Sequence, residues 1–218
     1  MADIMIIGGH GKIALLLAPL LDARGDAVTS VIRNPDQADE IRAAGATPLV
    51  LDVETATRDQ IAEALDGFDA IVWSAGAGGG NPDRTYAVDR DAAIRTMAAA
   101  GQAGVDRFVM VSYLGARPDH GVPSDEPFFA YAEAKAAADT ALRDTRLDWT
   151  ILMPGALTDE EPSGTIDPAA IRASNLPGTS RANVALVAAA ALAAPSSVRQ
   201  NISFTDGSVP IEVALAAL

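Results

Sequence analysis

A short apolar run followed at once by glycines constrains this chain most. Ile4-Met5-Ile6-Ile7 is typical of a strand buried on both faces of a parallel sheet. Gly8, Gly9 and Gly11 come next, and a segment with an apolar face begins at about Lys12. A strand, a glycine turn and a helix in this order predict a dinucleotide-binding site.

Two glycine registers fit this turn, Gly9-x-Gly11-x-x-Ala14 and Gly8-x-x-Gly11-x-x-Ala14. Glycine adopts the backbone angles of a tight turn freely, and its missing side chain lets a pyrophosphate approach the main chain. The first amide groups of the helix would then face the phosphates. A glycine turn that merely connects a strand to a helix is the alternative interpretation.

The composition favours a soluble globular protein with a sizeable core. The chain has 218 residues, of which 49% are hydrophobic, and its formal net charge is -13. Such a charge disfavours nucleic acid and anionic lipid as partners. The absence of cysteine excludes disulfides and thiolate metal sites, and we predict no metal site. With no room for a signal peptide before Ile4 and no apolar run long enough for a membrane span, we expect a cytoplasmic protein.

Apolar strand-like and helix-like segments alternate along the whole chain. The expected strands cover residues 4–7, 27–32, 47–51, 70–74, 107–111, 149–153 and 201–205. This alternation predicts an α/β fold of the Rossmann type, doubly wound, with a mostly parallel sheet and helices on both faces. We expect a single domain over residues 1–218, with a small substrate-covering segment around residues 155–179.

The residue after the second expected strand bears on the choice of cofactor. An NAD site usually places an acid there, but here the position holds Arg33, 22 residues beyond Gly11. A guanidinium can form paired hydrogen bonds with a 2′-phosphate, so NADP is favoured over NAD. A solvated arginine in a surface turn is the alternative.

Two further strand ends are expected beside the cofactor. Asp52 and Val53 follow the third strand, where they are placed to touch an adenine. Ser74, Ala75 and Gly76 follow the fourth strand, and their small size leaves room for a ribose. A flexible loop would explain the second segment equally well.

Tyr131 and Lys135 form a Tyr-x-x-x-Lys pair, which lies on one face of a helix. A nearby ammonium lowers the pKa of a phenol, and the tyrosine can then exchange a proton with a carbonyl or hydroxyl oxygen. Ser112, at the end of the fifth strand, is placed to bind the same oxygen. Only two of the 16 basic residues are lysines, Lys12 and Lys135, and both fall in these motifs. A core tyrosine beside a surface lysine is the alternative.

With these residues assembled, the chain resembles the atypical NAD(P)H-binding branch of the short-chain dehydrogenases/reductases, which includes NmrA-like and biliverdin/flavin-reductase-like proteins. The segments that carry the resemblance are residues 8–11, 31–34, 88–91, 104–112, 147–155 and 179–185. Two positions depart from the pattern of many relatives. Tyr113 stands where they have a second serine, and Met153 stands where they have an arginine before Pro-Gly.

The resemblance implies a catalytic set of Tyr131, Lys135 and Ser112. The cofactor-binding residues that we predict are Gly8, Gly9, His10, Gly11, Lys12, Ile13, Arg33, Asp52, Val53, Ser74, Ala75, Gly76, Lys135 and Pro154. The leading hypothesis is an NADP(H)-dependent oxidoreductase that acts on a small carbonyl, quinone or flavin-like substrate, as a monomer or a homodimer. A non-catalytic NADP-binding redox regulator and a sugar-nucleotide epimerase or dehydratase stay open.

Overall fold

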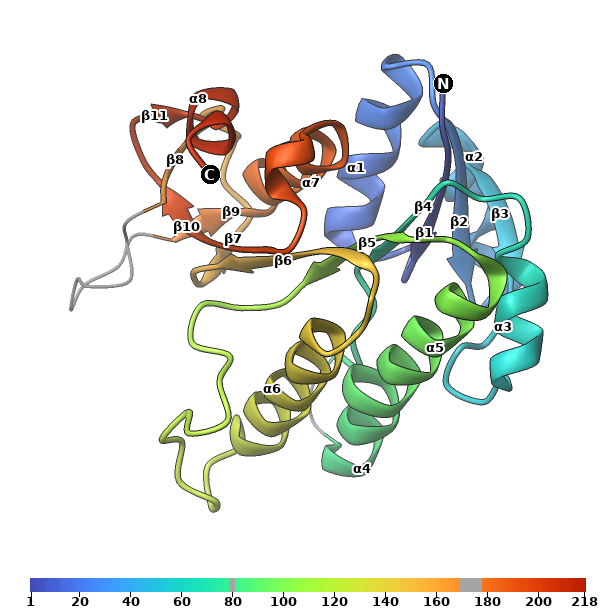
Figure 1. The fold of residues 1–218 in the computed structure, drawn as a ribbon, viewed down its shortest axis with the longest axis horizontal. Helices are drawn as coiled ribbons and strands as arrows, with labels where there is room; N and C mark the ends of the chain where they lie inside the picture. Colours follow the sequence, from blue (N-terminus) through green and yellow to red (C-terminus); the bar gives the residue numbers. More distant parts are fainter. Residues whose placement is uncertain (79–80, 169–177) are drawn as a thin grey trace.

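The computed structural model describes residues 1–78, 81–168 and 178–218. Its centre is a nine-stranded sheet in the order β11-β8-β10-β6-β5-β4-β1-β2-β3 (Figure 1). Seven neighbouring strands are parallel, from β10 to β3, and they follow the order of a doubly wound dinucleotide-binding sheet. The predicted fold class is confirmed.

The parallel strands alternate with helices along the chain. The strands are β1 (Asp3–Ile7), β2 (Ala27–Ile32), β3 (Thr47–Val50), β4 (Ala70–Trp73), β5 (Arg107–Val111), β6 (Asp148–Pro154) and β10 (Gln200–Asp206). The helices are α1 (Lys12–Ala23), α2 (Ala38–Ala43), α3 (Arg58–Ala64), α4 (Pro82–Thr85), α5 (Ala93–Ala103), α6 (Phe129–Arg143), α7 (Arg181–Ala193) and α8 (Ile211–Ala216). A π-helical turn, η2 (Tyr86–Ala92), joins α4 to α5, and two 3-10 turns occupy η1 (Pro35–Gln37) and η4 (Pro195–Ser197).

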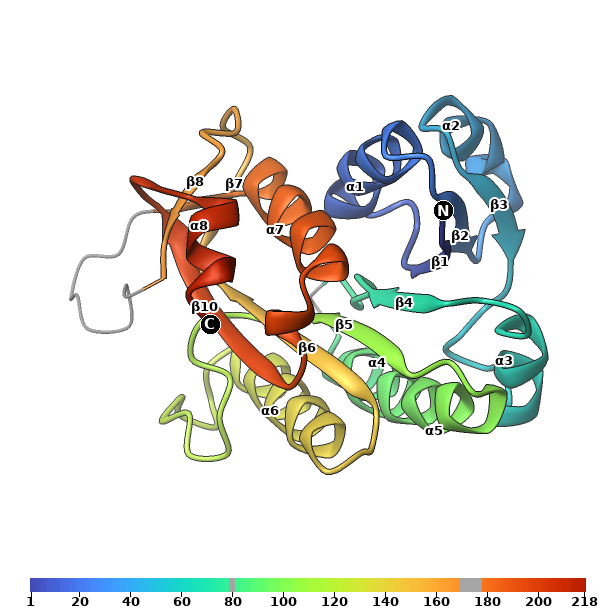
Figure 2. The ribbon, with the colours of Figure 1, turned by 45° about the horizontal axis from the view of Figure 1, so that its top comes forward.

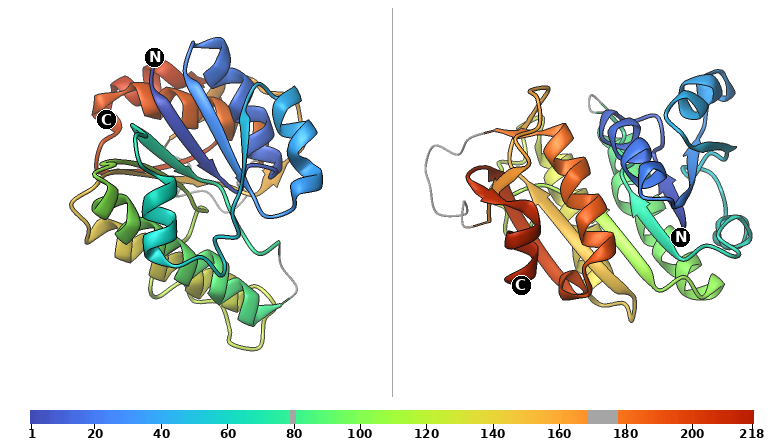
Figure 3. Two further views of the ribbon diagram at one scale, coloured as in Figure 1. Left: turned by 90° about the vertical axis from the view of Figure 1, so that its right-hand side faces the viewer. Right: turned by 90° about the horizontal axis from the view of Figure 1, so that it is seen from above.

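Alternate residues of the strands face the two sides of the sheet, and each side has its own apolar core. Ile4 and Ile6 of β1 pack with residues of α1, α2, α7 and α8. Met5 and Ile7 pack on the opposite side with residues of α3, α5 and α6. Figures 2 and 3 show α1 and α7 side by side over one face and α5 with α6 over the other.

Short strands extend the fold near its C-terminal end. β8 (Thr165–Asp167) and β11 (Val209–Pro210) join the sheet antiparallel, and β7 (Leu157–Thr158) pairs with β9 (Thr179–Ser180) in a separate ribbon. The sequence did not predict these strands, which belong partly to the segment expected to cover a substrate. Residues 169–177 of that segment lie outside the described residues, and its role stays a prediction.

Among the described residues, no helix has both the length and the apolar character that crossing a membrane requires.

Candidate functional site

The glycine turn between β1 and α1 is packed so tightly that side chains are excluded from it. Gly8 has φ +84°, and a Cβ there would lie 2.5 Å from the Cα of Ala75. A Cβ on Gly9 would lie 2.5 Å from the Cβ of Ser30. The amide of Gly9 donates to Val31 O at 2.8 Å, and that of Gly11 donates to Gly8 O at 2.9 Å. Contacts within the protein therefore require glycine at positions 8 and 9, whereas a Cβ on Gly11 would lie 3.1 Å from Gly8 O, a tight contact.

The turn leaves the N-terminus of α1 accessible to an anion. Gly11 is the N-cap residue, and within the described residues no side chain caps the first turn of this helix. Uncapped amide groups at a helix N-terminus attract negative charge. Together with the glycine backbone, they fit the pyrophosphate of a dinucleotide.

A cavity of about 290 Å³ lies beside this helix end, at the carboxyl ends of the parallel strands. Four strands end at this cavity, and the sequence predicted that each of these ends lies beside a cofactor. The predicted residues that line it are Gly8, His10, Gly11, Arg33, Asp52, Val53, Ser74, Ala75 and Gly76. In an open α/β sheet, this is the edge at which ligands bind.

Five predicted cofactor residues do not line this cavity: Lys135, described below with α6, and four others. Gly9 packs on Ser30, and Ile13 is buried in the core under α1. Lys12 forms an ion pair with Asp159 at 2.6 Å and lines a second cavity, of about 610 Å³, between α1 and α7. Pro154 ends β6, where its carbonyl accepts a hydrogen bond from the amide of Leu114 at 2.7 Å.

One carboxylate stands between two arginines in the wall of the 290 Å³ cavity. Glu54 Oε2 lies 3.1 Å from Arg84 Nε and 3.8 Å from an Arg33 guanidinium nitrogen. Arg84 also donates to Ala77 O at 2.7 Å. Asp52 accepts the amide of Glu54 at 3.0 Å. Arg33 thus lies where the sequence predicted it, but with an acidic partner that the sequence did not reveal.

Helix α6 presents Tyr131, Lys135 and Asp139, spaced four residues apart, on one face. Lys135 is 1% exposed, and its ammonium donates to Val111 O at 2.8 Å. Ser112 donates its hydroxyl hydrogen to Asp139 Oδ2 at 2.6 Å. The structure therefore brings Ser112 and Lys135 together at the carboxyl end of β5.

The environment of Tyr131 differs from the expected one. The ring packs against Tyr113 and Phe128, with centroids 5.4 and 5.2 Å away, beside a cavity of about 370 Å³. Burial, and then the charges of Asp89 and Asp139, raise the pKa of Tyr131. The sequence predicted a pKa lowered by Lys135. The prediction of direction was wrong because it took account of the lysine without the burial and the two carboxylates.

Two buried carboxylates near these residues were missed by the sequence reasoning. Asp89 accepts the amide of Ala77 at 2.9 Å, and a Cβ on Gly76 would lie 3.1 Å from its Oδ1. Burial raises the pKa of both Asp89 and Asp139, while the charge of Lys135 opposes the rise. Burial in turn lowers the pKa of Lys135. For Asp139 a signal was available, since it follows Lys135 by four residues on an alanine-rich helix.

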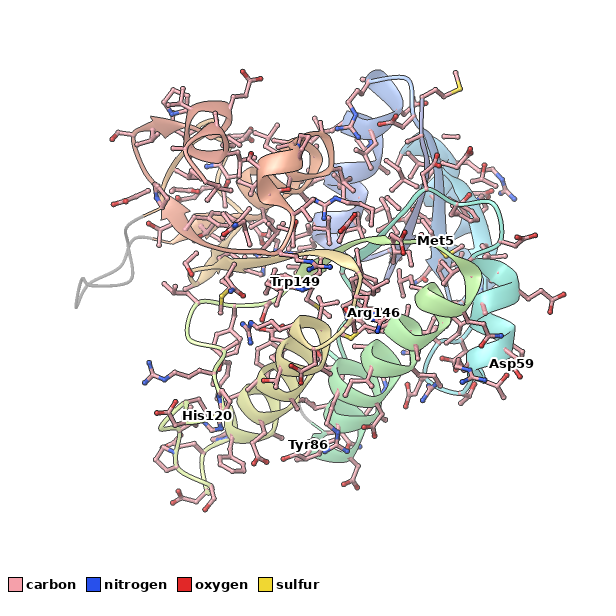
Figure 4. All side chains as sticks on the ribbon, viewed as in Figure 1. Met5, Asp59, Tyr86, His120, Arg146 and Trp149 are labelled. Carbon is pink, nitrogen blue, oxygen red and sulfur yellow. The ribbon has the colours of Figure 1, made fainter. Side chains whose placement is uncertain are left out.

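At the two positions that depart from the family pattern, the side chains of Tyr113 and Met153 pack against neighbouring residues. The Tyr113 hydroxyl is buried and has no hydrogen-bond partner in the described part of the chain, and its ring contacts Phe128 and Tyr131. Met153 is buried in β6, and its sulfur accepts a hydrogen bond from Ser203 at 3.7 Å. His120, labelled in Figure 4, lies in the loop before α6, where its ring packs edge-on against Phe129.

The fold and the glycine turn define an NAD(P)-binding protein of the Rossmann type. The model of the NAD(P)H-binding family matches residues 8–195. The chain therefore belongs to this family, and the resemblance to NAD(P)H-binding short-chain dehydrogenases/reductases is confirmed.

Similar proteins cover the whole chain. The chain is 33% identical to the uncharacterized sugar epimerase YhfK of Bacillus subtilis, over 99% of both chains. A putative NAD-dependent epimerase/dehydratase from Bacillus halodurans has a TM-score of 0.91 at 29% identity, covering 100% of both chains. The oxidoreductase ylbE from Lactococcus lactis has a TM-score of 0.86 at 28% identity, covering 99% of this chain and 96% of its own. The names of these relatives thus include epimerases and an oxidoreductase.

The close approach of Gly8 to Ala75 generates a prediction on stability. We expect Gly8→Ala to lower the free energy of unfolding by about 2–4 kcal/mol, because the new Cβ meets backbone and the φ angle is strained. Gly25→Ala is the matched control. Its φ is +89°, but a Cβ there meets no atom of the described chain within 4 Å, so about 1 kcal/mol is expected. Urea unfolding measures both, and equal losses would contradict the contact argument.

The raised pKa of Asp139 generates a prediction on pH dependence. Burial raises the pKa of Asp139 above its ordinary value of 3.8, so the folded protein binds this proton more tightly than the unfolded chain does. The contribution of Asp139 to the free energy of unfolding therefore falls as the pH rises from about 4 through the pKa of the folded state. Asp139→Asn removes that contribution. The free energy of unfolding of the variant minus that of the wild type should therefore increase with pH over this window. Asp125→Asn, in an exposed loop, serves as the control, and a difference that declines with pH would contradict the assignment.

Proposed function

We propose that this protein is an NADP(H)-dependent oxidoreductase of the short-chain dehydrogenase/reductase type. Its substrate would be a small carbonyl, quinone or flavin-like molecule. The observation that carries the proposal is the placement of Ser112, Lys135 and Tyr131 beside β5, at the same edge of the sheet as the glycine turn. Protein groups that could contact the cofactor's phosphates and its nicotinamide would thus lie at the same edge of the sheet.

The cofactor, when bound, supplies or accepts a hydride. The glycine turn and the start of α1 would hold its pyrophosphate, and Arg33 would hold a 2′-phosphate. Support for NADP rests on Arg33 and on the absence of an acid at that position, since membership of the NAD(P)H-binding family does not distinguish the two nucleotides.

The residues beside β5 would handle the proton. The phenol of Tyr131 would be protonated at neutral pH, as an ordinary phenol is, and would donate its proton to a substrate oxygen in the direction of reduction. Burial raises its pKa, which makes it a weaker proton donor than an exposed tyrosine. Asp139 fixes the hydroxyl of Ser112 through their 2.6 Å hydrogen bond. The apolar cavity beside Tyr131, lined also by Pro82, Pro127 and Phe128, would receive the substrate.

An epimerase or dehydratase acting on a nucleotide sugar is the second candidate. One similar protein is named an uncharacterized sugar epimerase and another a putative NAD-dependent epimerase/dehydratase, and both match this chain over almost their full length. The substrate assay must therefore include nucleotide sugars.

The cofactor assignment is tested by fluorescence titration with NADPH and NADH. We expect Arg33→Ala to weaken NADPH binding by about tenfold or more and NADH binding little, because the guanidinium contacts the 2′-phosphate. Arg42→Ala is the matched control, since Arg42 is exposed and pairs with Asp39 on α2. Equal losses for the two nucleotides would contradict the 2′-phosphate assignment.

The catalytic assignment is tested by turnover with a panel of carbonyl, quinone, flavin and nucleotide-sugar substrates. We expect Tyr131→Phe to reduce turnover by roughly 10²- to 10⁴-fold, with NADPH affinity within a few-fold of the wild type. Tyr86→Phe is the control, because the Tyr86 hydroxyl donates to Glu133 on the exposed surface of α6. Tyr86 is labelled in Figure 4. Unchanged turnover in Tyr131→Phe rules out the catalytic role. Tight NADPH binding with no turnover of any substrate favours the redox regulator instead.

A further inference from the structure

Glu54 occupies a position that the proposed function leaves unexplained. A single oxygen of its carboxylate, Oε2, pairs with Arg84 at 3.1 Å and with Arg33 at 3.8 Å. All three residues line the 290 Å³ cavity. An acid is thus placed against the same guanidinium that would receive a 2′-phosphate.

Glu54, Arg84 and Arg33 differ in how many contacts hold them in place and in how exposed their side chains are. The amide of Glu54 donates to Asp52 at 3.0 Å, and its carbonyl accepts from Arg95 at 3.0 Å. Arg84 is anchored on Ala77 O. The side chain of Arg33 is 57% exposed, against 25% for Glu54, and its longer contact to Oε2 leaves it the freest of the three.

The charges of this group are balanced without any ligand. Arg33 and Arg84 face Asp52 and Glu54, so the formal charges of these four residues cancel. A phosphate monoester brings about -1.5 to -2 charges near neutral pH. It would compete with Glu54 for the guanidinium groups and would be repelled by the carboxylate. A ribose with a free 2′-hydroxyl meets neither effect.

We propose that Glu54 determines cofactor selectivity as an internal competitor of the 2′-phosphate. Its carboxylate neutralises Arg33 and Arg84 in the free protein, and an NADP molecule must displace it, whereas NAD need not. The strength of the Glu54 pairs therefore sets how far the cavity prefers one nucleotide. The inference rests on the proposed use of this cavity for a nucleotide cofactor.

Glu54→Gln tests the proposal, because it removes the charge and keeps the shape. We expect NADPH and 2′,5′-ADP to bind roughly three- to tenfold more tightly, since partly exposed ion pairs are each weak, while NADH and 5′-AMP stay within about twofold. Titration calorimetry measures the two adenosine probes and fluorescence the two dinucleotides, so no turnover is needed. The gain should shrink at high salt, as expected for partly exposed charges.

Matched variants separate this effect from a general change in charge or folding. Glu40→Gln removes a carboxylate that pairs with His10, another residue of the cavity wall, and should leave the ratio of the two affinities unchanged. Glu54→Ala removes the same charge as Glu54→Gln but introduces no side-chain amide. Unfolding midpoints show whether each variant is folded.

The outcomes distinguish the two proposals. If the wild type binds 2′,5′-ADP and 5′-AMP but Glu54→Gln changes neither selectively, the inference is wrong while the cofactor site stands. If Glu54→Gln loses NADH affinity, the carboxylate binds the ribose hydroxyl instead, and the inference is also overturned. If the wild type binds no nucleotide, the proposed function fails and the inference fails with it.

Discussion

The close approach between the β1–α1 turn and the end of β4 is the constraint on which the site depends. Gly8 can lie against Ala75 because it has no side chain, so the turn that precedes α1 lies close to the end of β4. The helix N-terminus then opens toward the cavity at the sheet edge. A larger residue at position 8 would collide with the backbone at the end of β4 and separate the backbone proposed to bind phosphate from the other strand ends.

Much of the fold was predictable because it depends on local patterns. Short apolar runs gave the seven parallel strands, and the glycine turn identified the ligand edge of the sheet. β8 and β11 were not predictable, because each is two or three residues long and is defined by its antiparallel partner. Their pairing joins segments about 40 residues apart, and local apolar periodicity does not contain that information.

The site was predictable in its backbone and less so in its charges. Gly8, Gly11 and Arg33 line the cavity where motif spacing predicted a ligand, whereas Lys12 pairs with Asp159, 147 residues away. The pKa of Tyr131 was misjudged for a similar reason. Asp89 reaches this region from η2, and its charge acts on Tyr131 across the fold. Spacing within one helix shows which side chains share a face, but partners from other elements decide their electrostatics.

The two ends of the candidate site use charge in opposite physical regimes. At the end proposed for the adenosine, Arg33, Glu54 and Arg84 are partly exposed, so solvent screens their charges and exchanging one ionic partner for another costs little free energy. At the other end, Lys135 and Asp139 are buried, and the charge of each opposes the shift that burial imposes on the pKa of the other. Substitutions at the first end should therefore change which nucleotide binds. Substitutions at the second end should change the protonation of the remaining buried group and the free energy of unfolding together, because a shifted pKa in the folded state is itself a contribution to stability.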